Sequence, residues 1–229
     1  TCCEPSVVST TNTGYILSTL SFLNSDEVIA SDLYYGYQYY MTSGGTYVYD
    51  SGSTYVTNVG ISAQTQVFDT DLYKYYTSYR FVDGFGATGI TKVYDVDLNS
   101  LSEIYLTGIT DPSSSTYESS SGKIGIIDLY TDKIAIIDSS SETLDGYINL
   151  PGGYGYKALI ASDSINGSMY IVSSVPPTII CEVNPVSLTT GTTIPFTAVS
   201  TYITSMKFNP TNGYMYILQK NGRLDYFNT

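Results

Sequence analysis

Histidine and tryptophan are both absent from the 229 residues, and the nine lysines and arginines are outnumbered by 21 acidic residues. Without histidine the chain cannot build a Ser–His or Cys–His nucleophile, and it lacks the usual residue for general acid–base catalysis at neutral pH. The net charge is −12 and the few cations do not cluster, which argues against nucleic-acid binding because phosphate backbones are bound by clustered cations. No apolar run reaches the roughly 18 residues of a membrane-spanning helix, so we expect no membrane insertion by this chain.

Cysteine is also scarce, and Cys2, Cys3 and Cys181 are the only three. Adjacent cysteines rarely bond to each other because the geometry is strained, and three thiols without histidine do not suggest a zinc site. We therefore predict a disulfide between Cys181 and either Cys3 or Cys2, which would fix the N-terminal arm of residues 1–12 to the fold. The third thiol is left for a partner chain or stays reduced.

The residues that are abundant favour β-strands. Tyrosine occurs 25 times, hydrophobic residues make up 42% of the chain and charged residues only 13%. Aromatic and β-branched side chains suit pleated, half-buried strands, whereas a helical protein would use more alanine and glutamate. We expect an all-β protein with enough apolar surface for a core.

One short pattern recurs along the chain, in which an acid or amide precedes a glycine by four positions. The pairs are Asp32/Gly36, Glu118/Gly122, Asp163/Gly167 and Asn209/Gly213. Such a side chain can accept backbone N–H bonds inside a tight turn, and glycine supplies the positive φ that the turn requires. The pattern therefore predicts a recurring hairpin. A fifth stretch has Asp69 but carries Tyr73 where glycine is expected.

A second marker repeats in phase with the first. Acids that we expect to end the third strand of each unit stand 45, 43, 44 and 43 residues apart: Asp50, Asp95, Asp138, Glu182 and Asp225. Each unit divides into four short apolar runs separated by Pro, Gly or Ser. A four-stranded unit with a period of about 44 residues is typical of a β-propeller blade.

We predict a five-bladed β-propeller with four-stranded antiparallel blades, in one domain of residues 13–229. The blades are 27–61, 63–110, 113–150, 156–196, and 202–229 together with 13–23. The last unit stops after its third strand, and "TGYILSTLSFL" (13–23) reads as an extra strand. Pairing the two would close the ring and remove two free sheet edges.

Two stretches resemble the YVTN-type β-propeller repeat: "FNPTNGYMYIL" (208–218) and "KIAIIDSSSETLDGYINLPGGYGYKALIASDSINGSMYIV" (133–172). The resemblance implies an extracellular propeller of the kind associated with cell surfaces and S-layers. The wider group also contains metal-dependent lactonases. This chain departs from the enzymatic members because it has no histidine, and from the common seven-blade count because it has five units.

The predicted ligand or partner site lies on one face of the ring. The segment "TSYRFVDGFGATGI" (77–90) is longer than its counterparts and carries Phe81, Asp83 and Phe85. We expect it to lie beside the inter-blade loop "PGGYGY" (151–156), which contributes Tyr154 and Tyr156. Aromatic rings beside glycines can stack on sugars or fill a partner's pocket. The alternative is an ordinary surface loop.

Two acidic pairs could hold Ca²⁺, which prefers six to eight oxygen ligands. The pairs are Asp69 with Asp71 and Asp95 with Asp97. The alternative, which the repeat favours, is that these carboxylates cap turns. Otherwise we predict no cofactor.

Two further features concern the surface. The tyrosine clusters 34–40 and 73–79 suit either the packing between blades or an assembly interface. Asn166 begins the sequon Asn-Gly-Ser on a predicted turn, where a glycan could attach if the protein is secreted.

Together these features predict a non-enzymatic, extracellular propeller that mediates adhesion or assembly on a cell or virion surface, with an archaeal character in its composition. Its partners would be surface or structural proteins, including copies of itself. A glycan-binding lectin-like module and a metal-dependent lactonase-type hydrolase are the two alternatives.

Overall fold

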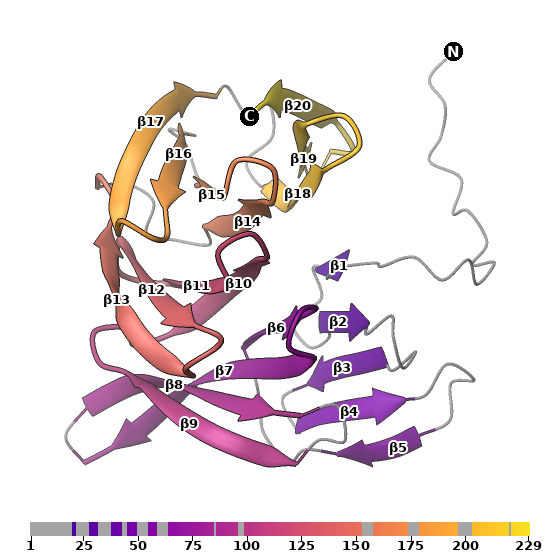
Figure 1. Ribbon diagram of the computed structural model, residues 1–229, viewed down its shortest axis with the longest axis vertical. Helices are drawn as coiled ribbons and strands as arrows, with labels where there is room; N and C mark the ends of the chain where they lie inside the picture. Colours follow the sequence, from indigo (N-terminus) through magenta and orange to yellow (C-terminus); the bar gives the residue numbers. More distant parts are fainter. Residues whose placement is uncertain are drawn as a thin grey trace.

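The computed structural model describes the backbone of five strands between residues 20 and 58, and both backbone and side chains from residue 64 onward, except residues 85, 96–98, 153–157, 174–178, 197–202 and 220. All regular structure in these ranges is β-strand (Figure 1). The described residues contain no helix long and apolar enough to cross a membrane.

The strands form five antiparallel sheets, each built from strands consecutive in sequence. The first sheet contains β1 (Leu20–Ser21), β2 (Val28–Ser31), β3 (Gln38–Thr42), β4 (Gly45–Tyr49) and β5 (Tyr55–Asn58). The second contains β6 (Thr65–Asp69), β7 (Lys74–Asp83), β8 (Gly86–Tyr94) and β9 (Ser100–Leu106). The third contains β10 (Pro112–Glu118), β11 (Lys123–Asp128), β12 (Lys133–Asp138) and β13 (Thr143–Asn149). The fourth contains β14 (Leu159–Asp163), β15 (Ser168–Val172), β16 (Ile179–Asn184) and β17 (Thr189–Pro195). The last contains β18 (Ile203–Asn209), β19 (Tyr214–Gln219) and β20 (Leu224–Asn228).

The recurring hairpin turn is confirmed wherever its residues are described. Gly122, Gly167 and Gly213 have φ values of 66°, 69° and 71°, each at the end of the turn between the first two strands of a sheet. Tyr73 takes the same place in the second sheet with a φ of 55°. The backbone therefore adopts the left-handed conformation at this position even where the residue is not glycine. Asp32 and Gly36 lie outside the described residues.

The expected series of strand-ending acids is partly wrong. Asp138 ends β12 and lies opposite Lys123, the first residue of β11. Counting from the turn in the same way, the corresponding positions in the later sheets are Asn184 and Asn228 rather than Glu182 and Asp225. Glu182 lies inside β16 opposite Tyr170, and Asp225 lies inside β20 opposite Ile217. This position accepts an amide as well as an acid. A search of the sequence for acids alone therefore selects the wrong residue in the last two sheets.

The core lies between successive sheets that pack face to face. Ile127, Ile134 and Ile136 of the third sheet pack against Met169 and Ile171 of the fourth. The spacing is so tight that a Cβ placed on Gly125 would be 2.6 Å from the Met169 sulfur. Similar apolar layers join the second sheet to the third and the fourth to the last. Each inner sheet is thus apolar on both faces, as stacked sheets require.

β2 of the first sheet and the first strands of the other four sheets contact one another in the order β2, β6, β10, β14 and β18. β1 also lies against β18, between the last sheet and the rest of the first sheet (Figure 1).

The predicted pairing of residues 13–23 with the last blade is not confirmed. Leu20 and Ser21, the described part of that segment, pair with Ile29 and Val28 of β2. Among the described residues the last sheet has three strands and ends at β20.

Candidate functional site

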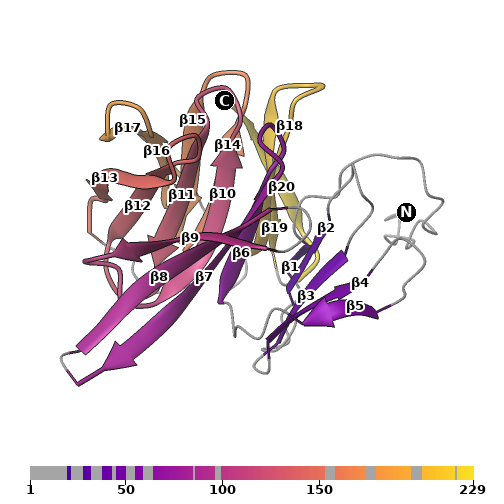
Figure 2. The ribbon, with the colours of Figure 1, turned by 60° about the horizontal axis from the view of Figure 1, so that its bottom comes forward.

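The segment predicted as a long loop is a projecting β-ribbon. β7 and β8 continue to Asp83 and from Gly86, so most of residues 77–90 are strand rather than loop. Residues 79–83 of β7 pair with residues 86–90 of β8. Gly86, with a φ of 143°, donates its N–H to the Asp83 carboxylate at 3.1 Å in the tight turn between the two strands. The ribbon extends past the neighbouring strands at the lower left of Figure 2.

The tip of this ribbon is exposed and apolar on both sides. Phe81 is 43% exposed and Val82 is 62% exposed. Because neighbouring residues of a strand point to opposite faces, the two side chains lie on opposite faces of the ribbon. Of the predicted ligand site, Phe81 and Asp83 are therefore at this tip, while Phe85, Tyr154 and Tyr156 lie outside the described residues. A binding role for this group stays a prediction.

At the base of the ribbon a polar group joins the second and third sheets. The buried Asp111 carboxylate accepts a hydrogen bond from the Gln64 side chain and lies 4.0 Å from the Arg80 guanidinium. Asp128 accepts the Asp111 N–H at 2.7 Å and the Thr131 hydroxyl at 2.6 Å. These carboxylates already have donors, so the group positions the ribbon and the inter-sheet loop.

Hydroxyl groups on the first strands also join neighbouring sheets. The hydroxyls of Thr65 on β6 and Ser115 on β10 are 2.8 Å apart and share a hydrogen bond. The Thr116 hydroxyl on β10 donates to that of Ser162 on β14 at 3.2 Å and accepts the Ser162 N–H at 3.1 Å. The polar residues of these strands thus bind to one another, sheet to sheet.

The first predicted metal pair caps a turn. The buried Asp69 carboxylate accepts the N–H groups of Asp71 and Leu72 at 2.8 and 2.9 Å. Asp71 accepts the Tyr117 hydroxyl at 2.7 Å. Burial, together with the hydrogen bond to Asp71 and the charge of Asp69, holds the pKa of Tyr117 well above its ordinary value. The alternative that these acids serve the turn fits this geometry.

The second predicted metal pair is described only in part. Asp95 accepts the backbone N–H and the side-chain amide of Asn99 at 2.8 and 2.9 Å, and Asp97 lies outside the described residues. In the ranges that the structure describes, no three acids or cysteines are placed to share a metal ion. Ca²⁺ binding stays a prediction.

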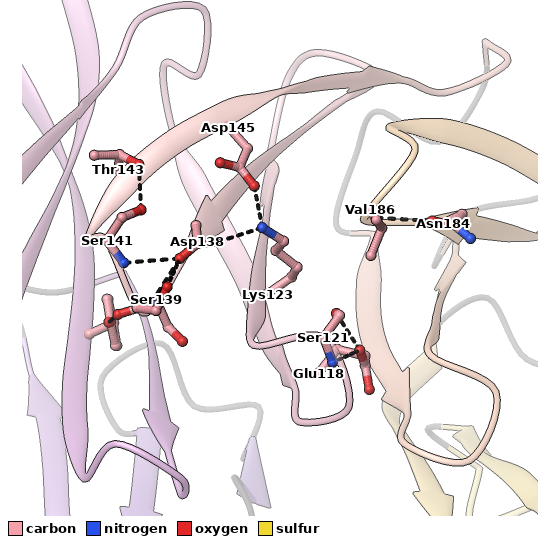
Figure 3. Close-up of polar contacts among 12 residues, drawn as sticks. Glu118, Ser121, Lys123, Asp138, Ser139, Ser141, Thr143, Asp145, Asn184 and Val186 are labelled. Atoms are coloured by element: carbon pink, nitrogen blue, oxygen red, sulfur yellow. Dashed lines mark hydrogen bonds and ion pairs between the residues drawn. The ribbon is translucent and has the colours of Figure 1, made fainter.

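Ion pairs near the turns join strands and sheets. Lys123 lies 2.6 Å from both Asp138 and Asp145 within the third sheet (Figure 3). Hydrogen bonds from Lys123 and Ser140 hold the pKa of Asp138 well below its ordinary value. Lys74 of the second sheet lies 2.6 Å from Glu142 of the third. Burial alone would raise the pKa of Glu142, but the hydrogen bonds from Lys74 and Ser102 outweigh it and lower the pKa. These pairs join strands and sheets and act structurally.

The predicted disulfide and glycan sites differ in exposure. Cys181 is fully buried in the apolar layer between the third and fourth sheets, in the middle of β16. Its pairing with Cys2 or Cys3, which lie outside the described residues, stays a prediction. Asn166 is exposed on the β14–β15 turn and its amide donates to Asp163 at 2.8 Å. The hydroxyl of the sequon residue Ser168 donates to Glu182 at 2.9 Å.

One face of the last sheet was not identified from the sequence. Lys207, Tyr216 and Tyr226 form a direct cross-strand row over β18, β19 and β20. Beside it lies the row of Ser205, Leu218 and Leu224. Tyr226, Leu224 and Leu218 are 65%, 57% and 39% exposed. We call these two rows the tyrosine face.

The same positions are covered in the inner sheets. Leu218 corresponds to Ile127 and Val172, counting from the preceding turn, and those two side chains are 1% and 0% exposed. Lys207 at the inner end of the row is mostly buried, and burial lowers its pKa to about 8. Strand alternation in "GRLDYFNT" (222–229) predicts that Leu224 and Tyr226 share a face. What the sequence could not indicate is that β1 of the first sheet lies against β18, the strand that carries Lys207.

Comparisons with known proteins identify the fold alone. No known family matches the sequence, and no curated protein matches it. The structure is similar to Kuenenia stuttgartiensis hydrazine synthase, with a TM-score of 0.65 and 10% identity, over 80% of this chain and 52% of that one. It is also similar to the dihydro-heme d1 dehydrogenase NirN in complex with DHE, with a TM-score of 0.55 and 13% identity, over 73% of this chain and 37% of that one. The chain thus spans about half or less of these propeller-like proteins, and it has a β-propeller-like, all-β fold of antiparallel four-stranded sheets.

Proposed function

We propose that the five sheets are the blades of one ring, completed by residues before β1 at the free edge of β20. The order of contacts among the first strands and the contact of β1 with β18 support this arrangement. The number of strands also supports it, because the first sheet has five strands and the last has three, whereas the other sheets have four. Amide hydrogen exchange tests it: deleting residues 1–19 should increase exchange of the outward amides of β20.

We further propose that the protein is a non-enzymatic, extracellular propeller that mediates adhesion or assembly on a cell or virion surface. The observation that carries this proposal is the exposed apolar tip of β7 and β8, where Phe81 is 43% exposed and Val82 is 62% exposed. Exposed apolar groups of this kind, rimmed by polar residues, mark interaction surfaces. The acidic, serine- and threonine-rich composition and the predicted disulfide and glycan suit an extracellular, archaeal or viral surface.

A glycan-binding module is the second candidate. Tyr214 and Tyr216 lie edge-on or tilted to Tyr226, with ring centroids 5.2 and 5.9 Å apart, and exposed tyrosines can stack on sugars. The metal-dependent lactonase has no comparable support, because the described members of its acidic pairs serve turns.

Imaging and binding measurements separate these proposals. Electron microscopy of the concentrated protein should reveal ordered polymers, and the purified protein should bind isolated cell envelopes or virions. A glycan array should stay blank, and calorimetry with Ca²⁺ should show no stoichiometric heat. A monomer at all concentrations that binds no envelope would refute the adhesion and assembly proposal.

A further inference from the structure

The outer edge of β7, near the tip of the ribbon, carries backbone groups that point away from β8. Gly89 of β8 lies opposite Arg80, but its N–H donates to the Ile109 carbonyl at 2.7 Å instead of to β7. Opposite residues of an antiparallel pair exchange two hydrogen bonds or none, so the N–H and C=O of Arg80 also point outward. Because the pattern alternates along a strand, those of Val82 point the same way.

No strand in the described part of the chain lies beside Arg80 and Val82 on this edge. The Ser78 carbonyl, two residues before Arg80, accepts the Gln64 N–H at 2.8 Å on the side of β6. The pairing of β6 with β7 reaches no farther than Ser78, and the ribbon continues past it (Figure 2). The backbone groups of the tip are therefore unpaired by any described strand.

This edge also lacks the irregularity that marks the outer edges of the sheets. The outer strands β5, β9, β13 and β17 each show a register shift in their pairing with the preceding strand, and bulges of this kind hinder the addition of a further strand. β7 pairs with β8 without a register shift from Tyr75 to Asp83. A regular, unpaired edge is a template for another strand.

We propose that the outer edge of β7, at Arg80 and Val82, binds an extended segment of a partner protein by strand addition. The inference rests on the adhesion function proposed above and identifies how the tip recognises its partner. Successive residues of an added strand point to opposite faces. One segment therefore covers Phe81 on one face and Val82 on the other, whereas a flat surface covers a single face.

The side chains along the edge define the segment that fits. The Arg80 side chain is 45% exposed, with its guanidinium 4.0 Å from Asp111, and the Asp83 carboxylate accepts a backbone N–H of the turn. Arg80 is thus the exposed cation that an incoming strand meets. Directly opposed side chains lie about 5 Å apart, so an antiparallel segment should have two apolar residues, opposite Val82 and Phe81, followed by an acid opposite Arg80.

The test titrates the full chain with the synthetic peptide Thr-Val-Val-Glu-Thr, blocked at both ends, and follows the backbone amides by NMR. The amide signals of Arg80 and Val82 should shift and become protected from hydrogen exchange. The Phe81 amide, which points to β8, should be protected with and without the peptide. The same peptide methylated at the amide nitrogens of its first valine and its glutamate should cause neither change, because those two N–H groups would face β7.

Two variants of the protein separate the backbone from the side chain. Val82→Pro removes the outward N–H but keeps an apolar side chain, and edge strands tolerate proline. It should bind the peptide about tenfold more weakly, whereas Val82→Thr, the matched control, keeps the N–H and should bind as wild type does. Protection of the Phe81 amide checks the hairpin in Val82→Pro, and if the hairpin is lost the methylated peptide decides alone.

Several results would overturn the inference. These are unshifted signals of Arg80 and Val82 with the unmodified peptide, or equal shifts with the methylated one. Protection of both amides in the purified protein at every concentration would show that the chain itself covers the edge. Protection that rises with protein concentration would identify a second copy as the occupant and refute the choice of partner.

Binding to isolated cell envelopes distinguishes this inference from the broader proposal. If wild type and Val82→Pro bind envelopes equally, adhesion stands and strand addition at this edge is refuted as its mechanism. If the peptide binds as expected but wild type binds no envelope, strand addition stands and adhesion is refuted.

Discussion

Replacing Lys207 with methionine should stabilise the protein at pH 7. Lys207 lies on β18 opposite Tyr216, and burial lowers its pKa from 10.5 to about 8. At ~1.4 kcal/mol per pH unit, keeping this amine protonated in the folded state costs about 3 kcal/mol at most. Partial contact with solvent reduces the cost, so we expect methionine, which has a similar length without charge, to raise the free energy of unfolding by about 1–2 kcal/mol.

The pH dependence of that gain follows from the direction of the shift. Between about pH 8 and pH 10.5 the unfolded chain binds more protons at this lysine than the folded chain does, so wild-type stability rises relative to the variant. Urea unfolding followed by circular dichroism at pH 7 and pH 10.5 should therefore show the gain shrinking toward zero. Lys207→Arg is the control, because its charge persists at both pH values, and it should remain less stable than the methionine variant throughout.

A loss of stability in Lys207→Met at pH 7, or a gain that does not shrink at high pH, would refute this reasoning. The first result would show that the amine has an anionic partner in the folded chain. The second would show that burial does not lower the pKa of Lys207.

Three further predictions concern the turns, the inter-sheet core and acid stability. Gly213→Ala should lower the free energy of unfolding by about 1 kcal/mol in urea because φ at this position is positive, although the added Cβ meets nothing closer than 3.9 Å. Gly84→Ala, where the Cβ enters open space, should leave the free energy of unfolding unchanged, and equal effects of the two substitutions would contradict the turn assignment. Gly125→Val should lower the free energy of unfolding by about 1–3 kcal/mol through overpacking, because atoms of Met169 and Ile160 lie 2.6 and 2.9 Å from the new Cβ. An unchanged melting temperature would contradict the face-to-face packing of the third and fourth sheets. The Asp138–Lys123 pair should contribute its full stability above about pH 5, and this contribution should decline as the pH falls below the ordinary aspartate pKa, toward the lowered pKa of Asp138. The free energy of unfolding of Lys123→Met should therefore fall less with acid in that range than that of wild type. An equal fall in both proteins would contradict the ion-pair assignment.

The sequence predicted the turns well because their chemistry is local. An acid or amide followed four residues later by a left-handed residue is enough to specify the hairpin, and even the exception, Tyr73, takes the predicted backbone conformation. The strand-ending acids failed at Glu182 and Asp225 because the turn also accepts asparagine, as Asn184 shows by accepting two turn N–H groups at 2.9 Å.

The two exposed surfaces were harder to predict. Glycines around Phe85 suggested a loop, whereas the residues before them alternate as a strand and pair as far as Asp83. Leu224 and Tyr226 look like an ordinary strand in sequence. Only the structure shows that Leu218 is 39% exposed, whereas Ile127 and Val172 at the same place in the inner sheets are buried.

The most direct test of the proposed ring is amide hydrogen exchange along β20, measured for the full chain and for a variant without residues 1–19. If residues before β1 pair with the free edge of β20, the outward amides of β20 should exchange faster in the shortened variant than in the full chain. Equal exchange rates in the two proteins would contradict the proposed closure of the ring.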